Sequence, residues 1–173
     1  MTRDEILLNS IWTNAKLLAY SEFFGKEVRL DLLTSTYNLE HTHEIISAKF
    51  TQAVNDFLAL PAQSKPLMQR LLYQHCLQCC ESTSYGGVKV RAEETEPAAN
   101  LRTFGVKDEA SAFAKAALSH VTIEEDESLK NRFVRILFYP EWETEHGCEL
   151  ILRNGELLDY FGEDGSYLGQ FEE

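Results

Sequence analysis

The chain has 173 residues and carries 16 Lys and Arg against 28 Asp and Glu, a formal net charge of −12. Hydrophobic residues make up 44% of it and charged residues 25%, as is typical of a globular domain. A chain of this length forms one domain, residues 1–173, with a substantial core. No apolar run approaches the roughly 20 residues of a membrane-spanning helix, and the first ten residues do not resemble a secretory signal. We therefore expect a soluble, cytoplasmic protein.

The negative charge is concentrated in the second half of the chain. Residues 91–173 contain 8 Lys and Arg and 19 Asp and Glu, whereas residues 1–90 contain 8 and 9. Such a field repels phosphate groups, whose binding depends on Lys and Arg, so we expect neither a nucleic acid nor a membrane partner. A basic protein would be attracted and its association accelerated. Acidity that serves only solubility is the alternative interpretation.

Two strands are predicted near the N-terminus, over IWTNAKLLAY and KEVRLDLL. Residues 28–32 alternate between apolar and polar types with the period of two that a strand requires. Gly25, in the connecting SEFFG, suits a tight turn because only glycine accepts a positive φ without steric cost. We expect a hairpin with Trp12 and Phe24 on its buried side.

Two helices are predicted next. Over residues 40–59, apolar side chains recur at helical spacing, with Thr42 as a candidate cap and Pro61 ending the element. A second helix follows over residues 66–81, with Ser64 as its candidate cap. The short connection LPAQSKP predicts that the two helices pack as an antiparallel pair.

Residues 82–105 are rich in Gly, Ser, Glu and Pro and are predicted to be mostly loop, with one short strand at most over 88–91. A short third helix is expected within KDEASAFAKAALSH, residues 107–120.

The rest of the chain, from Val121, has the pattern of strands. RFVRILFYP, CELILR and ELLDYFG are β-rich, and Asn154-Gly155 between the last two is a strong type I′ hairpin signal. EDG at 163–165 marks a further turn. Strands joined by short turns are antiparallel, and the chain shows no βαβ alternation. The predicted fold class is α+β: an antiparallel sheet, made of an N-terminal hairpin and a C-terminal meander, with an antiparallel helical pair on one face.

The cysteine-rich HCLQCC places Cys76 and Cys79 in a C-x-x-C arrangement. Zinc would need four N or S ligands, and no second ligand pair exists. A redox C-x-x-C would stand at the start of a helix, whereas this one lies inside a predicted helix. Core packing is therefore favoured over metal binding or redox chemistry, and the histidines of HTH, residues 41–43, are read as solvated or capping. The common phosphate-binding and hydrolase motifs do not occur. We expect no cofactor and no bound metal.

The segment PEWETEHGCEL most resembles a functional site. Pro140 would end a strand, and Gly147 would allow the sharp path into the next one. A buried Trp142 would need a partner for its indole N–H, while Glu145 and His146 could fix the turn. A structural turn is favoured. The alternatives are a protein contact, and a small hydrolase or metal-dependent enzyme that uses Glu145 and His146.

The pattern W-x-x-E-H-G, formed by Trp142, Glu145, His146 and Gly147 and followed by an extended run and N-G, resembles that of a group of small bacterial proteins of uncharacterised function. Similar α+β proteins are immunity proteins found beside polymorphic or contact-dependent toxins. The resemblance implies a non-enzymatic protein that binds a cognate basic toxin, since immunity proteins use acidic patches to occlude cationic toxin sites. It implies no catalytic residues.

The acids that best fit a role in binding such a partner lie in two groups. They are Glu124, Glu125, Asp126 and Glu127 in one run, and Glu163 and Asp164 in the last predicted turn.

Overall fold

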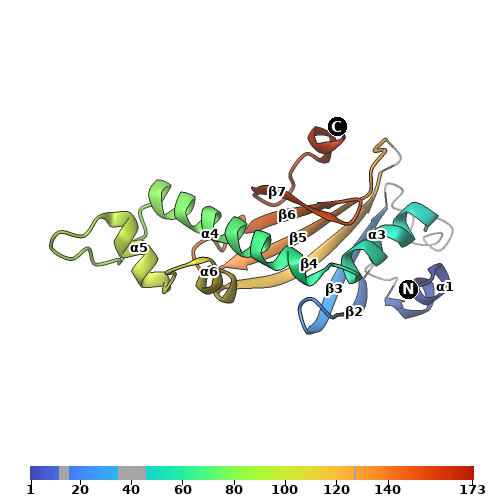
Figure 1. Cartoon of the computed structure of the whole chain (residues 1–173), viewed down its shortest axis with the longest axis horizontal. Helices are drawn as coiled ribbons and strands as arrows, with labels where there is room; N and C mark the ends of the chain where they lie inside the picture. The colour runs from blue at the N-terminus through green and yellow to red at the C-terminus, as the bar shows by residue number, and fades with distance from the viewer. Residues whose placement is uncertain (12–15, 35–45, 127) are drawn as a thin grey trace.

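The computed structural model describes residues 1–11, 16–34, 46–126 and 128–173. In this part of the chain the strands form a seven-stranded sheet whose spatial order equals the chain order (Figure 1). The strands are β1 (Ser10–Ile11), β2 (Lys16–Ser21), β3 (Lys26–Thr34), β4 (Ala116–Glu125), β5 (Phe133–Pro140), β6 (Cys148–Arg153) and β7 (Glu156–Gly162). Neighbouring strands are antiparallel except for β3 and β4. The predicted α+β class with a largely antiparallel sheet is confirmed.

The parallel pair joins the two halves of the sheet and differs from the antiparallel pairing that was expected throughout. In it, Leu30 lies opposite Val121. Parallel neighbours require a long crossover, and the intervening chain contains the helices. They are α3 (Ala48–Leu58), the 3₁₀ turn η3 (Ala62–Ser64), α4 (Lys65–Ser82), α5 (Glu96–Phe104) and α6 (Glu109–Lys115).

Helices α3 and α4 cover one face of the sheet, as expected. Phe50, Val54 and Phe57 of α3 are buried over the central strands, whereas α4 packs against α5, α6 and β7. Figure 1 shows that α4 begins near the end of α3 and runs onward, away from α3, instead of folding back beside it. The two helices therefore do not form the expected antiparallel pair. The sheet already covers the apolar side of α3, and η3 leads directly into α4.

The predicted bounds of the first of these helices require correction. It begins after Ser47, whose side chain accepts the N–H of Phe50. The expected cap Thr42, the histidines at 41–43 and Trp12 lie outside the described residues. The second helix matches its prediction within a residue or two and has a proline in its first turn, but Ser64 makes no side-chain capping bond.

Two helices were not predicted. The N-terminal α1 (Arg3–Asn9) is closed by a capping box between Thr2 and Glu5. Helix α5 replaces much of the predicted loop and the possible strand over 88–91 is absent; Thr95 caps the helix and Gly105, at φ +70°, ends it. Helix α6 agrees with the expected third helix, but β4 begins at Ala116, five residues before the predicted start of the strands.

The C-terminal meander follows the prediction closely. Asn154 and Gly155 have φ values of 52° and 89°, as a type I′ turn requires. Gly165, at φ +92°, forms the later turn. The chain then passes over the face of the sheet opposite the helices, where the 3₁₀ turn η4 (Leu168–Phe171) contributes Leu168 to a small second core with Phe133 and Ile151.

That second face also carries a buried ion pair. Glu149 is 0% exposed, and its carboxylate accepts bonds from Nη1 of Arg135 at 3.1 and 3.3 Å. It also accepts the backbone N–H groups of Gly165 and Ser166. The pair therefore fastens the turn after β7 to the middle of the sheet. Among the described residues, no helix is long and apolar enough to span a membrane.

Candidate functional site

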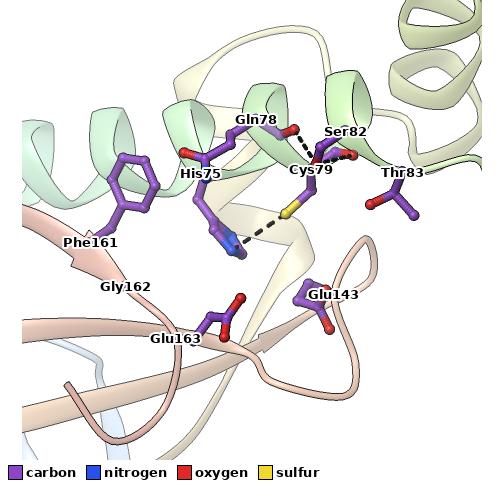
Figure 2. A pocket seen from close by; sticks show the side chains of 9 residues that line it. All are labelled: His75, Gln78, Cys79, Ser82, Thr83, Glu143, Phe161, Gly162 and Glu163. Atoms are coloured by element: carbon purple, nitrogen blue, oxygen red, sulfur yellow. Dashed lines mark hydrogen bonds between the residues drawn. The ribbon is translucent and has the colours of Figure 1, made fainter.

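A cavity of about 290 Å³ lies between the C-terminal half of α4, the turn after β5 and the end of β7 (Figure 2). Its lining consists of His75, Gln78, Cys79, Ser82, Thr83, Glu143, Phe161, Gly162 and Glu163. The volume is at the lower limit for small-molecule sites, so the cavity suits a single side chain or a small ionic group better than a large cofactor.

The innermost wall depends on a hydrogen bond between two buried rings. Nε1–H of Trp142 donates to Nδ1 of His75 at 3.1 Å, and the two residues are 1% and 5% exposed. Because Nδ1 accepts this bond, the single ring hydrogen of a neutral imidazole stands on Nε2. That nitrogen lies 3.5 Å from Sγ of Cys79, so His75 offers an N–H to the sulfur rather than a lone pair.

The electrostatics of this pair keep both groups uncharged at neutral pH. Burial lowers the pKa of His75 to about 4, although the charge of Glu143 opposes the shift. Burial, together with the charge of Glu143, raises the pKa of Cys79 to about 11. A nucleophilic cysteine needs a thiolate beside a cation or a base with a free lone pair. The thiol and imidazole of this cavity meet neither condition.

The turn after β5 is organised by Glu143, not by the residues that were expected to fix it. Oε1 of Glu143 accepts the N–H groups of Glu145 at 2.9 Å and His146 at 3.1 Å. Burial opposes the shift, but these bonds hold the pKa of Glu143 below its usual range. Glu145 and His146 are exposed and contribute no side chain to the cavity lining. Gly147 has φ +70°, as the predicted sharp path requires.

Trp142 behaves as predicted. It is buried, and its indole N–H has the partner that burial demands. Its carbonyl oxygen accepts the hydroxyl of Tyr85 at 2.7 Å. The turn is thus attached to α4 and to the segment that follows it.

The predicted partner-binding acids occupy different environments. Glu163 is exposed at the rim of the cavity, and the N–H of Asp164 donates to the carbonyl of His146 at 3.2 Å. Glu124 pairs with Nε of Arg135 at 3.2 Å, and Nη1 of the same arginine donates to the carbonyl of Ser166. Arg135 therefore connects Glu124 to the turn that contains Glu163 and Asp164. Its guanidinium group also neutralises part of the charge of Glu124.

Of the remaining members of the acidic run, only Asp126 has a described side chain. The carboxylate of Asp126 accepts the N–H of Ser128 at 2.7 Å. Glu127 and the side chain of Glu125 lie outside the described part of the structure.

The other cysteines are packing residues. Cys76 and Cys80 are buried on α4, as predicted, and a hydrogen bond to Cys80 raises the pKa of Cys76. Burial raises the pKa of Cys148. Among the described residues, no three His, Cys, Asp or Glu side chains are arranged to hold a metal ion.

Sequence reasoning missed the partnership that builds the site. His75 stands beside the cysteines of HCLQCC and 67 positions from Trp142, and no local pattern marks Phe161 or Thr83 as lining residues. The requirement of Trp142 for an acceptor was a usable signal, but it did not indicate which acceptor.

The profile of a domain of unknown function, DUF6985, matches residues 4–168. The chain belongs to the DUF6985 family. The DUF6985 match extends from α1 to the start of η4 and so includes every element that lines the cavity. The description of the family names no activity. Searches of curated proteins and of solved structures found no match.

Proposed function

We propose that this protein binds a basic protein partner and, most concretely, that it is an immunity protein that neutralises a cognate bacterial toxin by direct contact. One observation carries the proposal. The cavity beside α4 presents the carboxylates of Glu143 and Glu163, while the described residues of its lining include no Lys or Arg. Such a concave acidic surface suits a cationic group of a partner.

The chemistry of the cavity favours binding over catalysis. Its histidine is neutral, with one ring nitrogen occupied by Trp142 and the other carrying the hydrogen. Its cysteine is a thiol at neutral pH. A hydrolase that used Glu145 and His146 would place them in a concave site with convergent polar groups, whereas both are exposed and neither lines the cavity.

The overall charge supports the same proposal. The net charge of −12 resides almost wholly in residues 91–173, which supply Glu143 and Glu163. A field of this sign accelerates encounter with a basic partner and weakens as salt increases. The W-x-x-E-H-G segment resembles that of a group of uncharacterised small bacterial proteins, and the existence of similar α+β immunity proteins is consistent with this role.

The test uses the gene next to the one that encodes this protein. Its product is expressed alone and together with this chain, and growth of the host is measured. We expect the neighbouring product to stop growth, and co-expression to restore it. A harmless neighbouring product, or one whose toxicity this chain does not relieve, would contradict the proposal.

The electrostatic component is tested with the purified pair. Reversing Glu163 and Asp164 to Lys should slow association by about tenfold at low salt and much less at high salt. The matched control reverses Glu22 and Glu156, which are exposed and outside the cavity lining, and changes the net charge equally. Equal association rates for the two double variants would show that these acids do not steer the partner.

A further inference from the structure

Building on the proposed function, we infer that the cavity beside α4 receives the guanidinium group of an arginine side chain of the protein partner. The cavity lining includes two carboxylates and an aromatic wall, and its described residues include no Lys or Arg. Each of these properties follows from named contacts.

The acceptors come from both sides of the cavity. Oε1 of Glu143 is occupied by two backbone N–H groups, but no described residue donates to its Oε2. Among the described residues, Glu163 accepts a hydrogen bond at its backbone carbonyl, from the hydroxyl of Ser166, and none at its carboxylate. Figure 2 shows the two glutamates facing the helix that carries His75, Cys79 and the polar side chains of its last turn. A guanidinium group has five N–H donors in a fixed plane, which can bond to several carboxylate oxygens at once.

The absence of an internal cation has a structural cause. A histidine near a glutamate commonly becomes an imidazolium, which would neutralise Glu143. In this cavity the N–H of Trp142 donates to Nδ1 of His75. Protonation of Nδ1 would place its N–H opposite the indole N–H, so that two donors would face each other. His75, only 5% exposed, therefore lines the cavity as a neutral ring. The charge of the two carboxylates is left for a ligand.

The aromatic wall distinguishes a guanidinium group from an ammonium group. The ring of Phe161 lines the cavity and stands edge-to-face with His75, with their centroids 5.7 Å apart. Planar guanidinium groups stack on aromatic faces and are more weakly hydrated than ammonium groups. The volume of about 290 Å³ limits the occupant to something of the size of one side chain.

The experiment uses the whole protein and a minimal probe, N-acetyl-L-arginine methylamide. The indole N–H of Trp142 and the imidazole of His75 are followed by NMR at constant ionic strength as the probe is added. We expect saturable shifts of both signals. The citrulline analogue, which has the same shape but no charge, should bind about tenfold more weakly, because charge-assisted hydrogen bonds are lost.

The variant Glu143→Gln with Glu163→Gln should weaken binding of the arginine probe by about tenfold or more. Glutamine at 143 keeps an oxygen for the N–H groups of Glu145 and His146, so the turn is retained. The matched control, Glu22→Gln with Glu156→Gln, makes the same change in net charge at exposed positions outside the cavity lining and should leave binding unchanged.

Three results would overturn the inference: no saturable shift, equal binding of the arginine and citrulline probes, or equal loss in the two double variants. Equal binding of the lysine analogue would reject the preference for guanidinium. If the probe fails while the toxin is still neutralised, only the cavity assignment is wrong. If the probe binds as expected but the toxin is not neutralised, the proposed function is wrong and the arginine site stands.

Discussion

The indole N–H of Trp142 donates to Nδ1 of His75 over 3.1 Å and joins the turn after β5 to the middle of α4. The carbonyl of the same tryptophan accepts a hydrogen bond from the hydroxyl of Tyr85. The carboxylate of Glu143 stabilises the turn by accepting the N–H groups of Glu145 and His146. The most site-like segment of the sequence therefore supports the cavity and contributes Glu143 to its lining. Its own Glu145 and His146 contribute no side chain to the lining.

Trp142→Phe should raise the pKa of His75 from about 4 toward its ordinary value. Burial is the main cause of the low value, but the indole N–H also favours the neutral ring by bonding to it. The free energy of unfolding should fall by about 1–3 kcal/mol, since a buried acceptor loses its partner. An NMR pH titration of the imidazole measures the shift. Tyr85→Phe, which removes the neighbouring bond without touching Nδ1, should leave the pKa of His75 unchanged; a Trp142→Phe protein with the wild-type value would contradict the argument.

Stability should decrease as the pH falls from about 6.5 toward 4. In the unfolded chain His75 titrates near 6.5, whereas in the folded protein its pKa is about 4. Between these values the unfolded state binds the proton and gains stability relative to the folded state. From pH 7 to pH 5 this single group should cost about 2 kcal/mol.

Urea unfolding at the two pH values measures this loss. His75→Gln retains an oxygen that can accept the indole N–H but cannot take up the proton. It should therefore lose about 2 kcal/mol less than the wild type over the same interval. Parallel losses in the two proteins would show that His75 is not the titrating group.

Gly147→Ala should destabilise the protein more than Gly25→Ala. Both glycines have a positive φ, +70° and +63°, so both substitutions carry the strain of the left-handed region, about 1–2 kcal/mol. A Cβ at Gly147 would also lie 2.6 Å from the carbonyl oxygen of Phe138, whereas a Cβ at Gly25 meets nothing within 4 Å. The backbone around Gly147 must shift, and we expect an additional cost of about 2 kcal/mol. Equal midpoints in urea unfolding would show that the close approach to β5 is unimportant.

Arg135→Leu should destabilise the protein by about 3–5 kcal/mol, because it leaves the carboxylate of Glu149 buried without its cation. Adding Glu149→Gln should recover part of this loss, since glutamine is neutral and still accepts the N–H of Ser166. Arg70→Leu is the matched control: its partner Asp159 is exposed, and the loss should stay within about 1 kcal/mol. A double variant less stable than Arg135→Leu alone would indicate that packing, not the stranded charge, dominates.

Features set by neighbouring residues could be predicted from the sequence. Asn154-Gly155 determines a turn by its own conformational preferences, and both φ values are positive as expected. The proline at the start of α4 works in the same local way. Even the missed helix α5 has a visible start at Thr95 and end at Gly105. The helix was not predicted because the Gly- and Ser-rich residues before it indicated a loop.

Features set by distant residues could not be predicted. The acceptor for Trp142 lies 67 positions away, and nothing in the neighbourhood of His75 identifies it. The pairing of β3 with β4 depends on how the helices pack over the sheet, because either strand alone would fit beside any apolar neighbour. The cavity could not be predicted for the same reason, because its walls come from three distant parts of the chain: α4, the turn after β5 and the end of β7.

The parallel pair of β3 and β4 also determines when the sheet can be completed during synthesis. Leu30 and Val121 face each other although 91 positions separate them. At roughly 5–20 residues per second, the N-terminal hairpin emerges from the ribosome about 5–20 s before its partner strand exists. In that interval β3 has no neighbour on the side where β4 will pair, and the strands β4 and β5 that α3 will cover do not yet exist. The meander from β4 to β7 pairs locally and is made last, so β3 cannot complete its pairing until β4 has been synthesised.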